Sequence, residues 1–149
     1  MSWKNLAADG VVTPHKTSPN EIRDLRTLIA RDLADAAIEA LSDDRRFATA
    51  YNAALQISKM VIAASGYRLS RGQSAHYNSF ETVKTAIQDP EIDRLCDYFD
   101  TCRRKRNHID YDGSDVVTAT ETAEIIKNTT RYLEIAEKWI ADEHPALAF

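Results

Sequence analysis

Hydrophobic residues recur every three to four positions along most of the chain, which is the period of an amphipathic α-helix. The first stripe predicts a helix from Ser18 to about Leu41, and Ser42 begins a second helix that stops at Gly66. The first stripe consists of Ile22, Leu25, Ile29, Leu33, Ala36 and Ala40. The second consists of Phe47, Tyr51, Ala54, Leu55, Ser58, Val61 and Ile62. Many alanines in the second helix allow a neighbouring helix to pack closely against it.

Three more helical segments follow a polar loop over residues 67–75. A shorter helix runs from His76 to Ile87, and Asp89 with Pro90 starts a longer one. The stripe of the longer helix consists of Ile92, Leu95, Cys96, Phe99 and Cys102. The stripe of the last helix consists of Ile125, Thr129, Tyr132, Leu133, Ala136, Trp139 and Ile140.

Capping signals support these helix starts. Ser18 and Glu21, with proline between them in the first turn, form the pattern of a capping box, and Thr118 with Glu121 forms a second one. In a capping box the serine or threonine hydroxyl and the glutamate side chain each bind a backbone N–H group of the first turn. Both boxes are therefore predicted to form.

No segment alternates with period two for long enough to predict a strand. Residues 1–17 lack periodicity and predict an irregular N-terminal arm, which Trp3 and Leu6 attach to the rest of the protein. Residues 18–149 then form a single domain. We expect an all-α fold, an antiparallel up-and-down bundle of four long helices plus one shorter helix.

The composition is that of a globular protein, with 44% hydrophobic and 28% charged residues. A net charge of −4 argues against a protein that coats nucleic acid but allows a local basic patch. No apolar run reaches the roughly 18 residues of a membrane span, and the start carries no signal-peptide core. Cys96 and Cys102 lie six residues apart on one predicted helix, so their side chains cannot form a disulfide. We expect reduced thiols, a cytoplasmic location and no contact with a membrane.

Four consecutive cations, residues 103–106, stand near the end of the predicted fourth helix. The apolar stripe of that helix continues through Arg103, Arg106, Asn107 and Asp110, so a face that begins as core ends as polar. Inward-facing arginines are costly unless they have partners, and a bound anion is one such partner. The alternative is a structural network in which Arg103 pairs with Asn107 and Arg106 with Asp110 along the helix. The cluster then also complements the negative end of the helix.

An arginine guanidinium binds phosphate through two parallel hydrogen bonds. A His or Tyr beside it can carry a proton, the histidine far more readily, because the ordinary pKa is about 6.5 for His and about 10 for Tyr. Such a set suits RNA cleavage without a metal: a base assists attack by the 2′-hydroxyl, and arginines stabilise the charge on the phosphoryl oxygens. The histidines and cysteines lack metal-ligand spacing, and no phosphate loop or dinucleotide fingerprint is present. We expect no metal and no cofactor.

The segment Arg106-Asn107-His108-Ile109-Asp110-Tyr111 resembles the signature of the HEPN superfamily, all-α bundles found in many prokaryotic toxins and RNA-processing proteins. Its hallmark is an Arg, commonly followed by Asn, Asp or His, with a catalytic His four to six residues beyond the Arg. Residues 46–54, 64–68 and 72–76 are similar to an uncharacterised bacterial branch whose fourth helix ends in Arg-Asn, two residues, Asp-Tyr. The resemblance implies a dimer in which two signatures line one cleft.

The signature departs from the family pattern at its last position. Aligned on Arg106, the chain has Tyr111 where the catalytic His is expected; aligned on His108, it has Arg103 as the partner. We favour the first alignment, because it keeps Arg106 on the inward stripe and leaves His108 facing solvent. In some members a Tyr near the signature is adenylylated by a nucleotidyltransferase antitoxin, which makes Tyr111 a candidate for that modification. The tyrosine leaves open whether RNA is cleaved or only bound.

Residues outside this helix can join the site. His76, at the start of a helix and near Arg68 and Arg71, can approach the same cleft and supply the missing base. The alternative is a helix-start residue that bonds to the nearby backbone. Tyr67 and Tyr77 are candidates for stacking on bases, or else ordinary packing residues.

We therefore predict a cytoplasmic, dimeric, HEPN-like protein that binds RNA or a nucleotide. If the site is active, we expect a metal-independent endoribonuclease of a toxin–antitoxin or defence system. The candidate catalytic residues are Arg106, Tyr111, Arg103 and His108. The candidate RNA- or phosphate-binding residues are Arg103, Arg104, Arg106, Asn107, His76 and Arg68. An antitoxin or a nucleotidyltransferase is the expected protein partner. The alternative is a catalytically silent dimeric interaction module that binds a partner protein.

Overall fold

The structure is a computed structural model that describes residues 1–72, 74–111, 113 and 115–149, and of Tyr111 the backbone alone. Its helices are α1 (Trp3–Ala8), α2 (Pro19–Ala36), α3 (Asp43–Ala64), α4 (Ala75–Ala86), α5 (Pro90–Tyr111), α6 (Ala119–Glu143) and the short 3-10 helix η1 (Pro145–Leu147). The strands are β1 (Val12–Pro14) and β2 (Tyr67–Leu69). The predicted all-α class is confirmed, with one small sheet that was not predicted.

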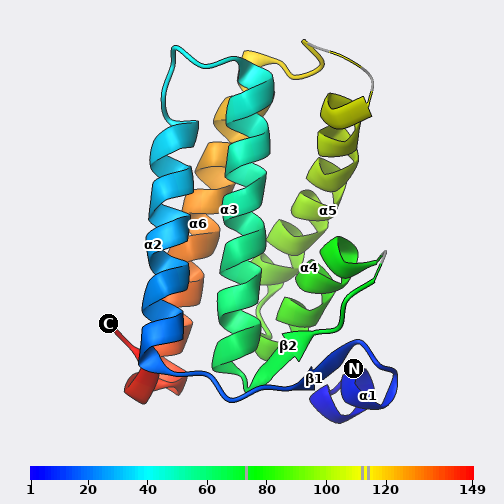
Figure 1. Cartoon of the computed structure of the whole chain (residues 1–149), viewed down its shortest axis with the longest axis vertical. Coiled ribbons are helices and arrows are strands. Elements are labelled where there is room, and N and C mark those ends of the chain that lie inside the picture. Colours follow the sequence, from blue (N-terminus) through cyan, green and yellow to red (C-terminus); the bar gives the residue numbers. More distant parts are fainter. Residues whose placement is uncertain (73, 112, 114) are drawn as a thin grey trace.

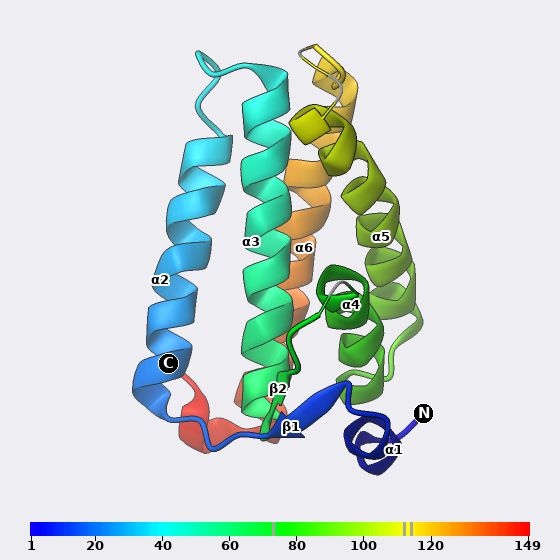
Figure 2. The ribbon, with the colours of Figure 1, turned by 45° about the vertical axis from the view of Figure 1, so that its right-hand side comes forward.

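Helix α3 lies at the centre of the molecule and contacts α2, α4, α5 and α6. Figures 1 and 2 show α2, α3, α5 and α6 aligned along the long axis, and the shorter α4 lying between α3 and α5. The predicted stripe of α3 is buried, from Phe47 through Tyr51 to Ile62, except that Leu55 is only half-buried. This buried face explains why a helix rich in alanine is the one that four neighbours pack against.

The N-terminal segment is more regular than predicted. Ser2 caps α1, and Leu6 on that helix is buried. The Trp3 ring stacks on the Tyr67 ring with 4.6 Å between centroids, so Trp3 and Leu6 do attach this segment to the bundle. The prediction of an irregular arm over residues 1–17 is therefore wrong, because a six-residue helix is too short to show a repeating apolar stripe.

Strands β1 and β2 pair antiparallel, with Thr13 opposite Arg68. Each strand has three residues, which is too few for an alternating pattern to appear in the sequence. The pairing joins the segment before α2 to the segment between α3 and α4, and so closes one end of the bundle (Figure 1).

Helix α2 ends at Ala36 and not near Leu41, so it is shorter than predicted. The Arg46 Nε donates to the Ala36 carbonyl oxygen at 2.8 Å, which satisfies an acceptor that the end of the helix leaves open. Ala40, assigned to the apolar stripe, is exposed in the following loop. Ser42 caps α3 as predicted, accepting from the Arg45 N–H.

The loop between α5 and α6 is fixed to the start of α3 by a buried carboxylate. Asp44 Oδ2 accepts from the Asp115 N–H at 2.7 Å, and Oδ1 accepts from the Val117 N–H at 3.0 Å. Asp115 has a φ of +61°, a left-handed conformation that Asp tolerates better than most residues. The predicted capping box of Thr118 and Glu121 is confirmed at the start of α6. These contacts hold the chain that enters α6.

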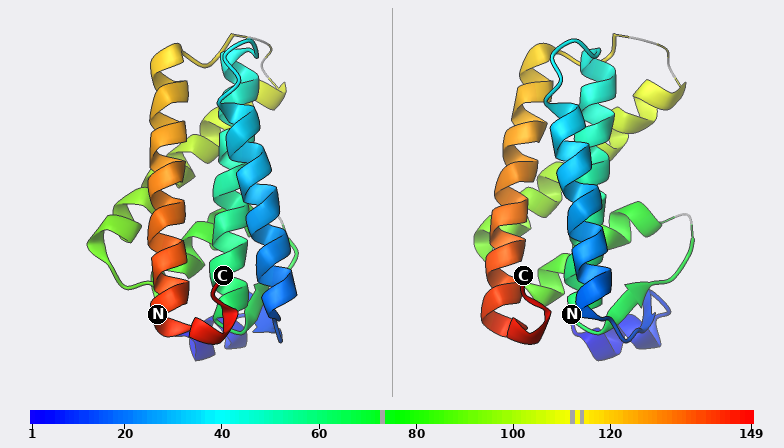
Figure 3. Two further views of the ribbon diagram at one scale, coloured as in Figure 1. Left: turned by 90° about the vertical axis from the view of Figure 1, so that its left-hand side faces the viewer. Right: turned by 60° about the vertical axis from the view of Figure 1, so that its left-hand side comes forward.

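Both termini lie at one end of the bundle, and the end of α5 lies at the other (Figure 3). Within the described residues, no helix combines the length and apolar character required to cross a membrane.

Candidate functional site

The predicted apolar stripe of α5 is buried from Ile92 to Cys102. Phe99 packs between the rings of Phe80 and Tyr132, with centroids 5.4 and 5.0 Å away. Cys96 and Cys102 are free, and burial raises the pKa of each thiol to about 12. Because the thiolate is the nucleophilic form, neither cysteine is suited to nucleophilic chemistry near neutral pH.

Each of the four cations that follow this stripe faces a carboxylate. The pairs are Arg103–Asp100 at 2.9 Å, Arg104–Asp100 at 4.0 Å, Lys105–Glu121 at 3.4 Å and Arg106–Asp110 at 3.1 Å. The structural alternative paired Arg106 with Asp110, which is observed, and Arg103 with Asn107, whereas Arg103 in fact bonds to Asp100. Asp100 lies one turn earlier and carries a charge, so it competes successfully with a neutral amide. The basic cluster is therefore largely compensated within the chain.

Burial separates these residues into two sets. The side chains of Arg103 and Arg106 are 29% and 25% exposed, whereas that of Arg104 is 72% exposed. Asn107 and His108 are both exposed, so the prediction that Asn107 faces inward is wrong. Figure 3 shows that the last turns of α5 lean away from α3, although Ile109 in these turns still packs against the core.

Arg106 lies against Tyr51, which α3 contributes. The guanidinium carbon is 5.7 Å from the centroid of the Tyr51 ring, within the range of a cation–π contact. The Nε of Arg106 is buried and has no hydrogen-bond partner among the residues that the structure describes. Burial raises the pKa of Tyr51, and the nearby charges of Arg106 and Arg103 only partly oppose that shift. Tyr51 is therefore a neutral phenol beside two guanidinium groups.

His76 reaches the same place from the start of α4. Its Nδ1 is 3.4 Å from the Tyr51 hydroxyl oxygen. His76 is an exposed residue, yet partial burial of its ring lowers its pKa, and the charges of Arg106 and Arg103 lower it further. The imidazole is consequently neutral near pH 7 and can accept a proton. Its observed partner is a side chain on α3, not the local backbone that the alternative interpretation proposed.

The structure thus places Arg103, Arg106 and His76 near one another and adds Tyr51, which the sequence marked only as a core residue. The signal in the sequence was a tyrosine hydroxyl on the apolar, alanine-rich stripe of its helix. This signal does not distinguish a tyrosine of a functional site from one that only packs in the core. The side chain of Tyr111 lies outside the described part of the structure. Arg104, Asn107 and His108 lie on the outer surface of α5.

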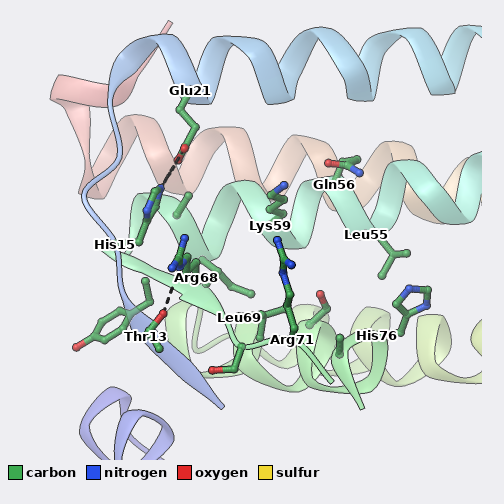
Figure 4. Close-up of a pocket in the computed structure, with 16 residues that line it drawn as sticks. Thr13, His15, Glu21, Leu55, Gln56, Lys59, Arg68, Leu69, Arg71 and His76 are labelled. Atoms are coloured by element: carbon green, nitrogen blue, oxygen red, sulfur yellow. Dashed lines mark hydrogen bonds and ion pairs between the residues drawn. The ribbon is translucent and has the colours of Figure 1, made fainter. Parts of the chain in front are cut away.

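Arg68 lies elsewhere, on β2, where its Nε donates to the Thr13 Oγ1 at 3.3 Å. It lines a cavity of about 650 Å³ that His76 also lines (Figure 4). His76 therefore lies between this cavity and the end of α5. Among the described residues, no group of His, Cys, Asp or Glu side chains is arranged to hold a metal ion.

Comparison with known proteins identifies one family. A family model described as HEPN_SAV_6107-like HEPN matches residues 37–137, a range that includes α3, α4, α5 and most of α6. Tyr51, His76 and Arg106 all lie within the matched range. No curated protein and no solved structure matches the chain.

Proposed function

This chain belongs to the HEPN_SAV_6107-like HEPN family, and from that premise we propose that it binds RNA or a nucleotide beside the end of α5. The observation that carries the proposal is that Arg106 and His76 lie near each other. The Arg106 guanidinium is half-buried, and its Nε has no acceptor among the described residues. The His76 imidazole has a lowered pKa, to which the charge of Arg106 contributes. A phosphate-binding cation beside a neutral base is the combination that metal-free RNA chemistry requires.

The existing ion pair of Arg106 does not prevent phosphate binding. Its partner Asp110 is 44% exposed, and ion pairs at such positions contribute roughly 0–1 kcal/mol. Leaving the Nε of Arg106 buried without an acceptor costs about 1–3 kcal/mol. If the Arg106 side chain rotates onto a phosphate, it therefore exchanges a weak ion pair for two charge-assisted hydrogen bonds. The same rotation gives its Nε a hydrogen-bond acceptor.

In the proposed reaction, His76 accepts the proton of an RNA 2′-hydroxyl. The 2′-oxygen forms a bond to the adjacent phosphorus, and the bond from phosphorus to the 5′-oxygen breaks. The products are a 2′,3′-cyclic phosphate and a 5′-hydroxyl that takes its proton from water. Arg106 and Arg103 stabilise the charge on the phosphoryl oxygens, and the Tyr51 hydroxyl orients His76. Tyr111 takes the position of the family's histidine, but an ordinary phenol pKa of about 10 makes it a poor base.

The family resemblance extends the proposal to partners. A second copy of the chain brings two α5 ends to one cleft, and Arg104, Asn107 and His108 contact the RNA from the exposed surface of that helix. The setting is a cytoplasmic toxin–antitoxin or defence system. An antitoxin, or a nucleotidyltransferase that modifies Tyr111, is the expected regulatory partner.

Cleavage of RNA in the presence of EDTA tests the catalytic part. We expect Arg106→Ala and His76→Ala to lower the cleavage rate by about 10²-fold or more, the usual loss when a positioned acid–base group is removed. Arg26→Ala is a matched control, because Arg26 is 33% exposed, has one described carboxylate partner and lies over the Phe149 ring. Equal background cleavage by all four proteins would exclude the enzyme.

A catalytically silent interaction module is the second candidate. It is favoured by one observation, that all four cations of residues 103–106 already face carboxylates of the same chain. This candidate predicts self-association or binding of a partner protein that Arg106→Ala leaves unchanged, with no RNA binding. A purely structural network predicts instead that Arg106→Ala lowers the melting temperature sharply and alters no ligand binding.

A further inference from the structure

The cavity of about 650 Å³ lies beside the proposed α5 site, with which it shares His76, and has polar groups of its own. It opens between α3, β2 and the start of α4, and the segment leading into α2 borders its far end (Figure 4). None of Arg103, Arg104, Lys105 or Arg106 lines it. Its volume is in the range of about 300–1,000 Å³ that small-ligand sites occupy.

Three cations line this cavity: Lys59 from α3, Arg68 from β2 and Arg71 from the loop after β2. Figure 4 shows Arg71 extending across the cavity toward the part of α3 that carries Lys59. Neither Lys59 nor Arg71 has an ion-pair partner within the described part of the chain, in contrast to the four cations of α5. Like charges facing a common hollow repel each other, and an anion between them removes that repulsion.

The carboxylate that lines the cavity, Glu21, already has partners. Its oxygens lie 2.9 and 3.0 Å from the His15 Nε2, and Thr17 Oγ1 donates to it at 2.7 Å. Burial alone would raise the pKa of Glu21, but the hydrogen bonds from Thr17 and His15 and the charges of His15 and Lys59 together lower it. Glu21 is thus held as a carboxylate at the end of the cavity where His15 and Arg68 lie, and Lys59 and Arg71 lie farther along it (Figure 4).

Gln56 supplies a further unused group. Gln56 lines the cavity, and its Oε1 is buried and has no hydrogen-bond partner among the described residues. A buried acceptor without a donor costs about 1–3 kcal/mol, and a ligand N–H group would satisfy it. The cavity therefore offers cations for a phosphate and an acceptor for an N–H group.

We propose that this cavity is a second binding site, for a small phosphorylated molecule with an N–H donor, the chemistry of a nucleoside phosphate. The phosphate lies between Lys59 and Arg71, and the N–H group reaches Gln56. The ligand is either a free nucleotide or one nucleotide of a bound RNA. The proposal does not rest on the proposed function at α5, because Lys59, Arg71 and Gln56 take no part there.

Calorimetric titration of the full-length protein with adenosine monophosphate, and separately with inorganic phosphate, tests this site. We expect Lys59→Ala and Arg71→Ala to weaken binding of both probes at least tenfold, since each removes a charge-assisted contact. Both side chains belong to exposed residues, so these variants should fold normally. Gln56→Leu should weaken adenosine monophosphate binding several-fold and leave phosphate binding unchanged.

A control on the same helix checks that the effect belongs to this cavity. Arg45→Ala removes an exposed cation from the helix that carries Lys59 but outside the cavity lining, and we expect it to leave adenosine monophosphate binding unchanged. Loss of RNA cleavage in Arg106→Ala tests the α5 site separately. Competition by an oligoribonucleotide identifies RNA as the source of the nucleotide, and its absence identifies a free nucleotide. Equal affinity for wild type, Lys59→Ala and Arg71→Ala, or no binding at millimolar probe, would overturn the proposal.

Discussion

At the scale of single residues, the charge of Arg106 and the protonation of His76 are linked. Burial is the larger cause of the lowered pKa of His76, and the guanidinium groups of Arg106 and Arg103 add to it. The folded state therefore disfavours the imidazolium form. By linkage, stability is retained above the ordinary pKa of about 6.5 and declines as the pH falls from there through the lower folded pKa.

An NMR titration of His76 measures this link. We expect a pKa below 6.5 in the wild type, and a higher value in Arg106→Ala that stays below 6.5, because burial remains. Arg104→Ala is the control, since Arg104 is exposed and is not among the causes of the shift. A wild-type pKa at or above 6.5, or no change in Arg106→Ala, would contradict this account of His76.

The sequence identified some residue roles and not others. Arg106 stood out because a cation on an apolar stripe breaks the pattern of its own helix. His76 was a candidate, but its distance from Arg106 depends on how α4 packs, which no local pattern specifies. Asn107 was predicted to face inward but is exposed, because ideal helical geometry cannot show that α5 leans away from α3 near its end.

At the scale of elements, the chain just before α6 is held against the start of α3. The buried Asp44 carboxylate accepts two backbone N–H groups of this segment, from Asp115 and Val117. The capping box of Thr118 then starts α6 directly after these contacts. A carboxylate in the first turn of α3 thus fixes the start of α6, the helix whose Glu121 pairs with Lys105 of the basic cluster.

Substitution of Asp44 tests this anchor. Asp44→Ala leaves two N–H groups without their charged acceptor, and we expect a loss of about 2–4 kcal/mol in the free energy of unfolding. Asp43→Ala is the matched control: its side chain is 37% exposed and pairs with Arg46 at 3.8 Å, so a loss of roughly 1 kcal/mol or less is expected. Denaturant unfolding measures both, and equal losses would refute the anchor.

The helices with a repeating stripe were predictable because each buries a face along many turns. Two capping boxes looked alike in the sequence, yet only that of Thr118 and Glu121 forms. At the other, Ser18 caps α2, but the Glu21 side chain binds His15 and Thr17 instead of the Ser18 backbone. A partner from outside the helix competes for the carboxylate, and the spacing within the helix does not reveal it.

At the scale of the whole molecule, two groups of cations lie on or beside α3. One is the cluster of residues 103–106 on α5, and the other consists of Lys59, Arg68 and Arg71 at the cavity. The cluster on α5 is compensated by carboxylates of neighbouring turns and of α6, whereas Lys59 and Arg71 at the cavity have no ion-pair partner among the described residues. His76 lies between the two groups. The cavity could not be predicted, because its lining comes from α2, α3, α4 and both strands, far apart in the chain.

The central claim, that Arg106 holds a phosphate group, is tested most directly by fluorescence anisotropy of a labelled oligoribonucleotide over a series of salt concentrations. We expect Arg106→Ala to bind about tenfold or more weakly than the wild type, with a salt dependence reduced by about one phosphate contact, and Arg26→Ala to bind as the wild type does. Equal affinity and equal salt dependence for all three proteins would contradict the claim.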